Sequence, residues 1–400
     1  MADYEMPSGG DWSIHRGGAV FAEGVASLAV EACTFARVGG NAVFLSGAVR
    51  GARIAGNDFV LVGESAVATV GRLPTADGFN VARASGSTTE CGAYGYPEDT
   101  AVVGNAIRGV GVHGKQTSAL FIALSCRTNF IGNVAYNGPR AGVNVNDGFC
   151  GGHTFERNLI FNWVRETQDH GPINTWDRAM YLMPQQPGDG VDSDQPTLIP
   201  GWIHIAGNLI MNGPSGNRDL GNMFPAIDND DGSAYYRMVR NVLVYGGAKN
   251  YLGHDKIWDG NLVAFPDRWV GDPCAQLWGG AHNNFVSNRC VVGQGLAAHT
   301  HNASDLPAPL GLDGTAKGFQ CRIDLSNATL RNHTGFTASN AYWTVNASWS
   351  FGCGNATSNS TTFTLPMLQT QGWALGSTVG DVAGLTVGEV VGWAKEMLGV

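Results

Sequence analysis

The residues best suited to chemistry gather in one short segment of a chain that carries little charge. Residues 165–178 read RETQDHGPINTWDR and combine carboxylate, guanidinium, imidazole and indole side chains. A second acidic group, with Asp228, Asp230 and Asp231, follows further along the chain. Two carboxyl groups in different environments are the minimum machinery for glycosidic cleavage, because one protonates the leaving oxygen while the other acts as nucleophile or base. We therefore predict a catalytic pair made of Asp169 and either Asp230 or Asp231.

The remaining polar residues near these segments are predicted to bind the substrate. Such side chains can hydrogen-bond to a sugar or stack on its ring. The predicted set is Arg165, Glu166, His170, Trp176, Arg178, Asn144, Asn146, Asp147, Asp228 and His254. For Asp147, which precedes a glycine, ordinary turn chemistry is the alternative. The acidic run from Asp228 to Asp231 could hold Ca²⁺ through oxygen ligands, although it lacks the spacing of an EF-hand loop. We predict no required metal or cofactor.

Composition bounds the class of protein. The 400 residues include 57 glycines, and only 14% are charged while 44% are hydrophobic. This balance is unlike disordered or collagen-like chains, and surface helices would need more charge. A net charge of −9 leaves no basic field for nucleic acid, and no long apolar run could span a bilayer. The expected partner is a polysaccharide or oligosaccharide, with no nucleic acid and no membrane, and the protein is expected to be a monomer.

A short repeat must position the candidate site. Its unit is an apolar residue, one or two small or polar residues, an asparagine and another apolar residue. The asparagines of the unit are Asn57, Asn105, Asn133, Asn158, Asn208, Asn241, Asn261 and Asn288, and Cys33 holds the same place in an earlier copy. The intervals from Cys33 onward are 24, 48, 28, 25, 50, 33, 20 and 27 residues. They predict one coil per about 25 residues, with two double intervals and one insertion.

A second register of short alternating segments lies between these units and predicts strands. It begins at Ala42, Ala66, Ala119, Ala141 and Ala226. Short strands and tight turns at a constant period predict an all-β, parallel solenoid, in which stacked coils make one core. We expect the repeated asparagines to adopt the left-handed turn conformation and to hydrogen-bond to one another as an internal ladder. Asparagines that merely mark the turns of a β-sandwich are the alternative.

The two ends of the chain differ in pattern. Residues 1–304 are predicted to form the solenoid with a catalytic groove. Residues 305–400 are predicted to form irregular, glycosylated coils packed on the same solenoid. Val390, Trp393, Ala394 and Met397 share one face of a short C-terminal helix, which we expect to cap the open end of the solenoid.

Cysteines and glycosylation acceptors indicate the secretory pathway or the extracellular space. Eight cysteines accompany six Asn-X-Ser/Thr sequences, at Asn302, Asn327, Asn332, Asn346, Asn355 and Asn359. The first five residues lack the basic and apolar regions of a signal peptide. We expect disulfides Cys126–Cys150, Cys274–Cys290 and Cys321–Cys353, and leave the pair Cys33–Cys91 open, because sequence does not determine connectivity.

Several segments carry a family resemblance. ESAVATVG, GPRAGVNVNDGFCGG, NLIFNWVRETQDHGPINTWDR and PAIDNDDGSAYYRMVRNVLVYG resemble the right-handed, single-stranded parallel β-helix proteins of the pectate-lyase-like superfamily. The chain is most similar to family 141 of the glycoside hydrolases, which contains α-L-fucosidase and xylanase activities. The resemblance covers roughly residues 12–300 and implies Asp169 with Asp230 or Asp231 as the catalytic carboxylates. This sequence departs from the pattern at His170 and by an insertion at about residues 184–201.

Three functions follow from these patterns. The first is a secreted glycoside hydrolase acting on a fucose- or xylose-containing polysaccharide, with or without sulfate. The second is a polysaccharide lyase or uronate C5-epimerase, which needs a cation and a base beside a uronate carboxylate. The near absence of lysine from the candidate site counts against this second function. The third is a non-catalytic, carbohydrate-binding solenoid.

Overall fold

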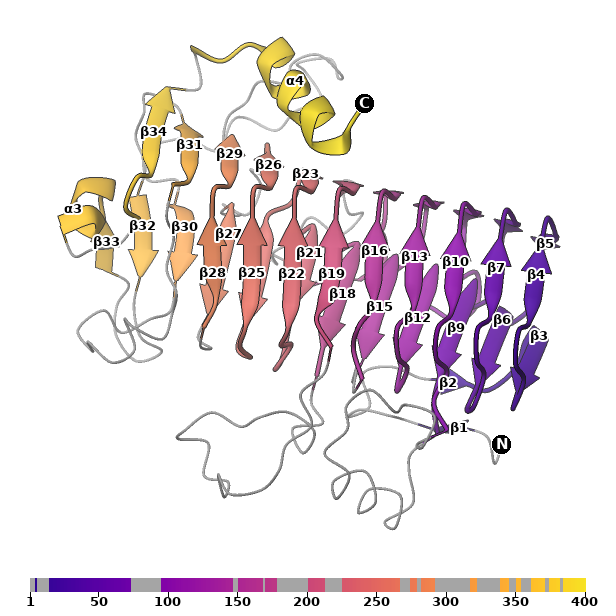
Figure 1. Cartoon of the computed structure of the whole chain (residues 1–400). Helices are drawn as coiled ribbons and strands as arrows, with labels where there is room; N and C mark the ends of the chain where they lie inside the picture. Colours follow the sequence, from indigo (N-terminus) through magenta and orange to yellow (C-terminus); the bar gives the residue numbers. More distant parts are fainter. Residues whose placement is uncertain are drawn as a thin grey trace, which may run out of the picture.

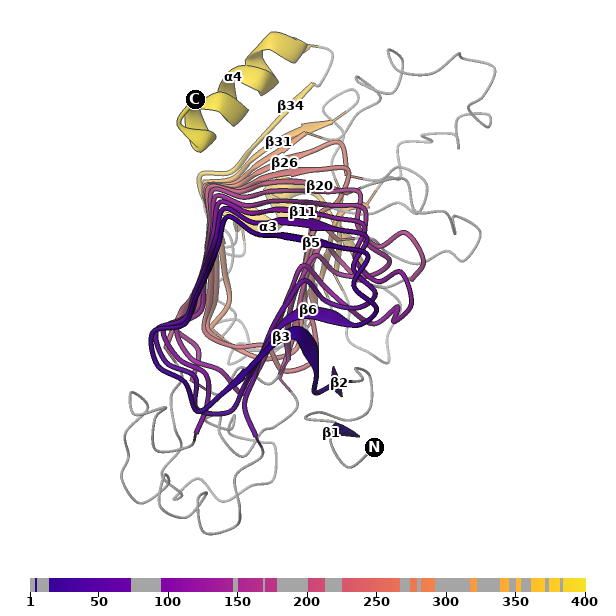
Figure 2. The same cartoon turned by 90° about the vertical axis from the view of Figure 1, so that its right-hand side faces the viewer.

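The protein is a right-handed parallel β-helix built from three sheets, and most coils contribute one strand to each of them (Figures 1 and 2). The computed structural model describes residues 4–5, 14–72, 95–146, 150–167, 170–177, 201–212, 225–266, 274–278, 282–291, 317–321, 339–344, 350–353, 361–370, 374–381 and 384–400. A short antiparallel pair, β1 (Tyr4–Glu5) and β2 (Ile14–His15), precedes the coils. The predicted fold class is confirmed.

Among the described residues, sheets I and III continue to the C-terminal coils, whereas sheet II ends before them. Sheet I contains β3 (Gly18–Glu23), β6 (Asn41–Ser46), β9 (Val67–Val70), β12 (Leu120–Ala123), β15 (Val143–Asn146), β18 (Ile173–Trp176), β21 (Ile227–Asn229), β24 (Ala248–Tyr251), β27 (Ala275–Trp278), β30 (Lys317–Cys321), β32 (Ser350–Cys353) and the antiparallel β33 (Thr361–Phe363). Sheet II contains β4 (Ala29–Glu31), β7 (Arg53–Ala55), β10 (Ala101–Val103), β13 (Asn129–Ile131), β16 (Thr154–Glu156), β19 (Ile203–Ala206), β22 (Tyr236–Val239), β25 (Lys256–Asp259) and β28 (Asn284–Val286). Sheet III contains β5 (Thr34–Ala36), β8 (Asp58–Val60), β11 (Ala106–Arg108), β14 (Val134–Tyr136), β17 (Leu159–Phe161), β20 (Leu209–Met211), β23 (Val242–Val244), β26 (Leu262–Ala264), β29 (Arg289–Val291), β31 (Ala341–Thr344) and β34 (Thr378–Asp381).

The predicted asparagine ladder lies at the turn between sheets II and III, where it links each coil to the next. In a typical step, Asn105 Nδ2 donates to Asn133 Oδ1 at 2.9 Å and to the carbonyl oxygen of Ile54 at 3.0 Å. The ladder begins at the backbone amide of Cys33, which donates to Asn57 Oδ1, and it continues beyond Asn288 to Asn340. Buried polar groups are stable only when they are hydrogen-bonded, so the ladder satisfies a row of amides inside the solenoid.

Two details of the repeat were predicted wrongly. The 48-residue and 50-residue intervals are single coils with insertions, because Asn57 bonds directly to Asn105 and Asn158 to Asn208. The left-handed residue is also not the ladder asparagine. It is the residue before it, as at Gly56 and Gly104. A left-handed conformation is easiest for glycine, and an added Cβ at these two positions would meet no atom within 4 Å. Conformation, and not lack of space, therefore favours glycine here, although Arg157 and Arg240 adopt the same backbone conformation before Asn158 and Asn241.

The C-terminal helix packs on the side of the solenoid, and it does not close its end. Two helices are described, α3 (Leu365–Thr370) and α4 (Val387–Leu398). Val390 of α4 is buried against Val242, Leu262 and Val291, which project from the outer face of sheet III. Figure 2 shows α4 lying over this sheet. The predicted apolar face of the helix is present. It packs against the apolar outer surface of β23 and β26, so the helix covers the outer face of sheet III and not the end of the solenoid. The domain boundary at residue 304 stays a prediction, although sheets I and III continue past it.

Two of the predicted disulfides are present, Cys126–Cys150 and Cys274–Cys290. Cys321 and Cys353 lie directly opposite each other on β30 and β32. Cys33 is an exposed free thiol, whereas Cys91 and all six glycosylation acceptors lie outside the described residues. Within the described ranges, no helix is long and apolar enough to cross a membrane. Disulfides of this kind are typical of oxidising compartments.

One buried histidine predicts how stability depends on pH. His153 is fully buried, its Nδ1 accepts from the Thr128 backbone amide at 3.0 Å, and burial lowers its pKa to about 3. Between pH 6.5 and about 3 the unfolded chain therefore binds a proton that the folded chain excludes. We expect this residue to lower the unfolding free energy as pH falls, by on the order of 2 kcal/mol between pH 6.5 and 5.

The measurement compares urea unfolding of the wild type and His153→Asn at both pH values. Asparagine is a suitable replacement because Asn283 Oδ1 accepts from the Lys256 amide at the same place in another coil. His153→Asn should reduce the loss of stability at acid pH, whereas His113→Asn, at an exposed position, should not. Equal pH dependence in all three proteins would contradict the assignment.

Candidate functional site on the outer face of sheet I

The candidate site lies where the outer face of sheet I changes from apolar to polar. Strands β6 to β12 place Phe44, Ala68 and Phe121 outward in one buried apolar cluster. From β15 onward the same position is polar: Val143 and Val145 point into the core, so the residues that alternate with them along the strand point outward. The strand register aligns four outward side chains, here called the outer row: Asn144, Asn174, Asp228 and Lys249.

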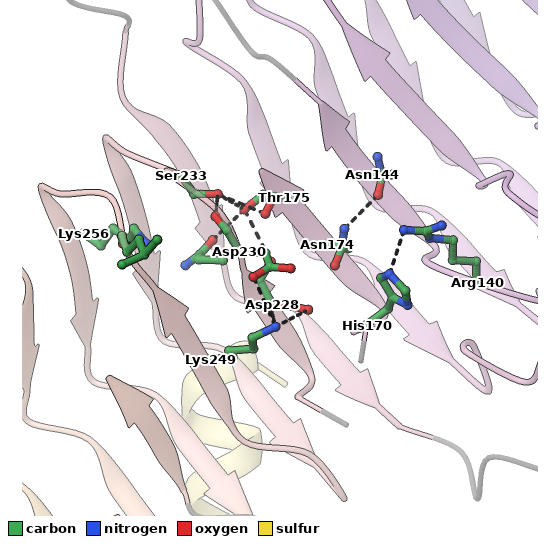
Figure 3. Close-up of polar contacts among 12 residues, drawn as sticks. Arg140, Asn144, His170, Asn174, Thr175, Asp228, Asp230, Ser233, Lys249 and Lys256 are labelled. Atoms are coloured by element: carbon green, nitrogen blue, oxygen red, sulfur yellow. Dashed lines mark hydrogen bonds and ion pairs between the residues drawn. The ribbon is translucent and has the colours of Figure 1, made fainter. Parts of the chain in front are cut away.

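Two carboxylates share one ammonium group at the end of the outer row (Figure 3). Lys249 Nζ lies 3.1 Å from Asp228 Oδ1 and 3.3 Å from Asp230 Oδ1. The side chain of Asp228 is 0% exposed and that of Lys249 is 3%, whereas that of Asp230 is 19%. An opposite charge at this distance stabilises each carboxylate. Asp230 is therefore the carboxylate on the more open side of the cluster.

The turn after β21 holds Asp230 in place through its backbone. The Asp230 amide donates to the carbonyl oxygen of Thr175 at 2.7 Å, and Ser233 Oγ donates to the carbonyl oxygen of Asp230 at 2.7 Å. Ser233 Oγ also lies 2.9 Å from Thr175 Oγ1. These contacts tie the turn to the neighbouring strand β18. These hydrogen bonds fix the backbone of Asp230, as is expected for a carboxylate that must be positioned accurately.

An arginine, a histidine and a tryptophan flank the other end of the outer row. Arg140 Nη2 donates to His170 Nε2 at 2.7 Å, and its guanidinium lies 5.6 Å from the centre of the Trp176 ring. A guanidinium has no acceptor, so Nε2 of His170 is the acceptor in this contact. Trp176 projects outward but is only 2% exposed. Its indole packs against Arg140, and its contact with substrate stays a prediction.

Beneath this face, a lysine points into the solenoid. Lys256 is fully buried at the start of β25, and its Nζ donates to the carbonyl oxygen of Leu252 at 2.6 Å. Burial lowers the pKa of Lys256 to about 7, while Asp230 and Asp228 oppose this shift and Lys249 adds to it. The charges of the outer row are therefore coupled to a group in the interior.

The other predicted site residues are placed as follows. Arg165 and Glu166 are exposed in the turn between β17 and β18, where Glu166 pairs with Lys115 at 3.0 Å. His254 lies in the turn after β24, with its Nδ1 2.6 Å from Asp255 Oδ2. Asp231 follows Asp230 and is half-buried. Asp169, Asp147 and Arg178 lie outside the described residues, so the Asp169 half of the predicted pair stays a prediction.

Three residues of the site were missed by sequence reasoning. Lys249, Arg140 and Asn174 all belong to the cluster, and Lys249 in particular overturns the argument that the site lacks lysine. The signal was present in the strand AKNY, whose second residue occupies the outward position. It was overlooked because the segments between the acidic runs were not recognised as further strands of the same sheet.

The carboxylates proposed for a calcium site contact a lysine in this structure. The ammonium of Lys249 lies between the carboxylates of Asp228 and Asp230, where it supplies the positive charge that a cation would bring. Across the described ranges, no group of three or more histidine, cysteine, aspartate or glutamate side chains is placed to hold a metal ion. Calcium binding near Asp228 stays a prediction.

The fold and the site define a parallel β-helix protein with a buried, charged cluster on the outer face of one sheet. Scans against protein-family models and curated proteins found no match, so the likeness to family 141 stays a resemblance. Among solved structures, the chain is similar to a mutant of a PL6 family alginate lyase, with 10% identity and a TM-score of 0.36. The match covers 89% of this chain and 53% of that one, so this chain spans about half the length of the lyase chain.

Proposed function

We propose that this protein is a carbohydrate-active enzyme, a glycoside hydrolase whose site is the polar part of the outer face of sheet I. The observation that supports it most is the cluster in which Lys249 bridges Asp228 and the more exposed Asp230. Asp228 is buried and holds the ammonium, and the ammonium in turn keeps the charge on Asp230. Asp230 is thereby suited to act as the nucleophile or as the base that activates water.

The general acid of this mechanism is assigned to Asp169 from the sequence alone. It would protonate the leaving glycosidic oxygen, while Asp230 attacks the sugar carbon or removes a proton from the attacking water. Arg140 and His170 would orient the sugar from the other end of the outer row. Secretion and a monomeric state belong to the proposal, and the two disulfides support the former.

Lys249 favours a second candidate, a polysaccharide lyase or uronate epimerase. Both reactions remove a proton beside a uronate carboxylate, and a nearby cation stabilises the charge that develops. Lys249 and Arg140 supply cations on the outer face of sheet I. We rank this candidate second because Asp228 and Asp230 already balance Lys249, which leaves little net positive charge for a polyanion.

Product masses decide between the two reactions. The protein is incubated with fucose-, xylose- and uronate-containing polysaccharides, and the products are examined by mass spectrometry and ultraviolet absorbance. We expect one water to be added for every bond cleaved, with no new absorbance. Unsaturated, absorbing fragments would establish the lyase instead. Binding without any product from the whole panel would favour a non-catalytic solenoid.

A further inference from the structure

Three asparagine amides on β15 and β18 form a hydrogen-bonded chain that leaves two polar atoms unsatisfied. Asn174 Nδ2 donates to Asn144 Oδ1 at 3.1 Å, and Asn144 Nδ2 donates to Asn146 Oδ1. All three side chains are fully buried. Within the described part of the protein, Asn174 Oδ1 and Asn146 Nδ2 have no hydrogen-bond partner. We call Asn144, Asn146 and Asn174 the amide chain.

The amide chain needs one donor and one acceptor from outside, whichever way its side chains are turned. Each amide has one carbonyl oxygen and one amino group. Two bonds linking three amides in sequence always leave an oxygen at one end and an amino group at the other, even if every amide is flipped. Buried polar atoms without partners are unfavourable, so a ligand that supplies both kinds of group would be stabilised here.

The position of the amide chain connects it to the proposed reaction centre. Asn174 is the register neighbour of Asp228, and Figure 3 shows Asn174 between the Arg140–His170 pair and the Asp228–Lys249 pair. The side chains at the margins are more open, since His170 is half-buried and Asp230 is 19% exposed. A sugar bound at Asp230 would therefore present its neighbouring substituents toward the amide chain.

We propose that the amide chain is a subsite for the hydroxyl groups of a neutral sugar. A hydroxyl group both donates and accepts, so hydroxyls can satisfy the two open ends. A carboxylate or sulfate group has only acceptor oxygens, and beside Asn174 it would also meet two carboxylates, Asp228 and Asp230, that share the single ammonium of Lys249. The subsite therefore selects uncharged, hydroxylated sugar units over uronate or sulfated ones. This inference rests on the proposed function for the location of the sugar and adds its chemical class.

The test measures binding separately from cleavage. A glycan array carrying neutral xylose- and fucose-containing oligosaccharides, with their sulfated and uronate counterparts, is probed with the wild type and with Asn174→Leu. We expect the wild type to bind neutral glycans, and the variant to bind them about tenfold more weakly, as for the loss of one buried hydrogen bond. Asn129→Leu, at a partly exposed position on β13, is the matched control and should bind like the wild type.

Circular dichroism establishes that each variant is folded. If Asn174→Leu does not fold, Asn146→Ser, which shortens the other end of the amide chain, is expected to weaken binding similarly. The inference is overturned if the wild type prefers sulfated or uronate glycans, binds none of the glycans, or binds neutral ones equally well after substitution. If neutral-glycan binding depends on Asn174 but no hydrolysis product forms, the proposed reaction is refuted. The subsite is then still supported.

Discussion

Asp230→Asn is expected to lower the rate of glycan cleavage by about 1,000-fold, the effect typical of removing a catalytic acid or base. Asp230 is the more exposed of the two carboxylates that contact Lys249, so it is the one that a sugar can reach. Asparagine keeps the size of the side chain and loses its charge. The measurement is the initial rate of product formation on whichever polysaccharide of the panel is cleaved, with circular dichroism and the thermal midpoint as checks on folding.

Asp231→Asn is the matched control, because it changes the adjacent residue in the same turn. The backbone carbonyl of Asp231 accepts from the Asp177 amide at 2.9 Å, and this contact does not depend on the carboxylate. We expect its rate to fall by less than about tenfold. A large loss of cleavage rate in Asp231→Asn with a small loss in Asp230→Asn would assign the catalytic role to Asp231 instead of Asp230. Full activity in both variants would remove the reaction centre from this face of the solenoid.

Lys249→Met is expected to lower the unfolding free energy by about 3–5 kcal/mol, the cost of breaking a buried ion pair by removing one partner. The substitution leaves the carboxylate of Asp228, which is 0% exposed, without the ammonium that neutralises it. Methionine retains much of the volume of the lysine stem, so the loss is mainly electrostatic. Urea unfolding monitored by tryptophan fluorescence at neutral pH measures the change.

Two further variants separate charge from packing. Adding Asp228→Asn to Lys249→Met removes the uncompensated charge and should restore a large part of the lost stability. Lys115→Met breaks an ion pair with Glu166 in which both side chains are about half exposed, and should cost no more than about 1 kcal/mol. Equal losses of unfolding free energy in Lys249→Met and Lys115→Met would contradict the claim that the buried pair of Lys249 and Asp228 contributes more to stability than an exposed pair.

The repeat made most of the fold predictable. Each coil places an asparagine at one corner, and the ladder from Asn57 to Asn288 was correctly inferred because stacking forces identical side chains into contact. The length of each coil was less predictable. An insertion such as residues 73–94 leaves the stacking of the flanking coils unchanged, so sequence spacing could not separate one long coil from two. Likewise, the apolar face of α4 was visible in the sequence, but its packing partner was not.

The candidate site was predictable only in part. Asp228 and Asp230 stood out because charge is rare in this chain, and Asn144 and Asn146 because they follow a recognisable strand. Lys249 and Arg140 gave no such signal, since a single cation in a sequence does not reveal its partner. Their importance follows from contacts with residues of other coils, at 3.1 Å for Lys249 and 2.7 Å for Arg140.

The sequence by itself determined the parallel solenoid and its corner ladder of asparagines. These features depend on residue types that recur at a period, and periodicity can be read along one dimension. Only the tertiary structure decided that Lys249 pairs with both Asp228 and Asp230, that Arg140 contacts His170 and Trp176, and that α4 covers a side of the solenoid. The physical reason is that strand register brings together residues from different coils, and insertions of unequal length hide that register from the sequence.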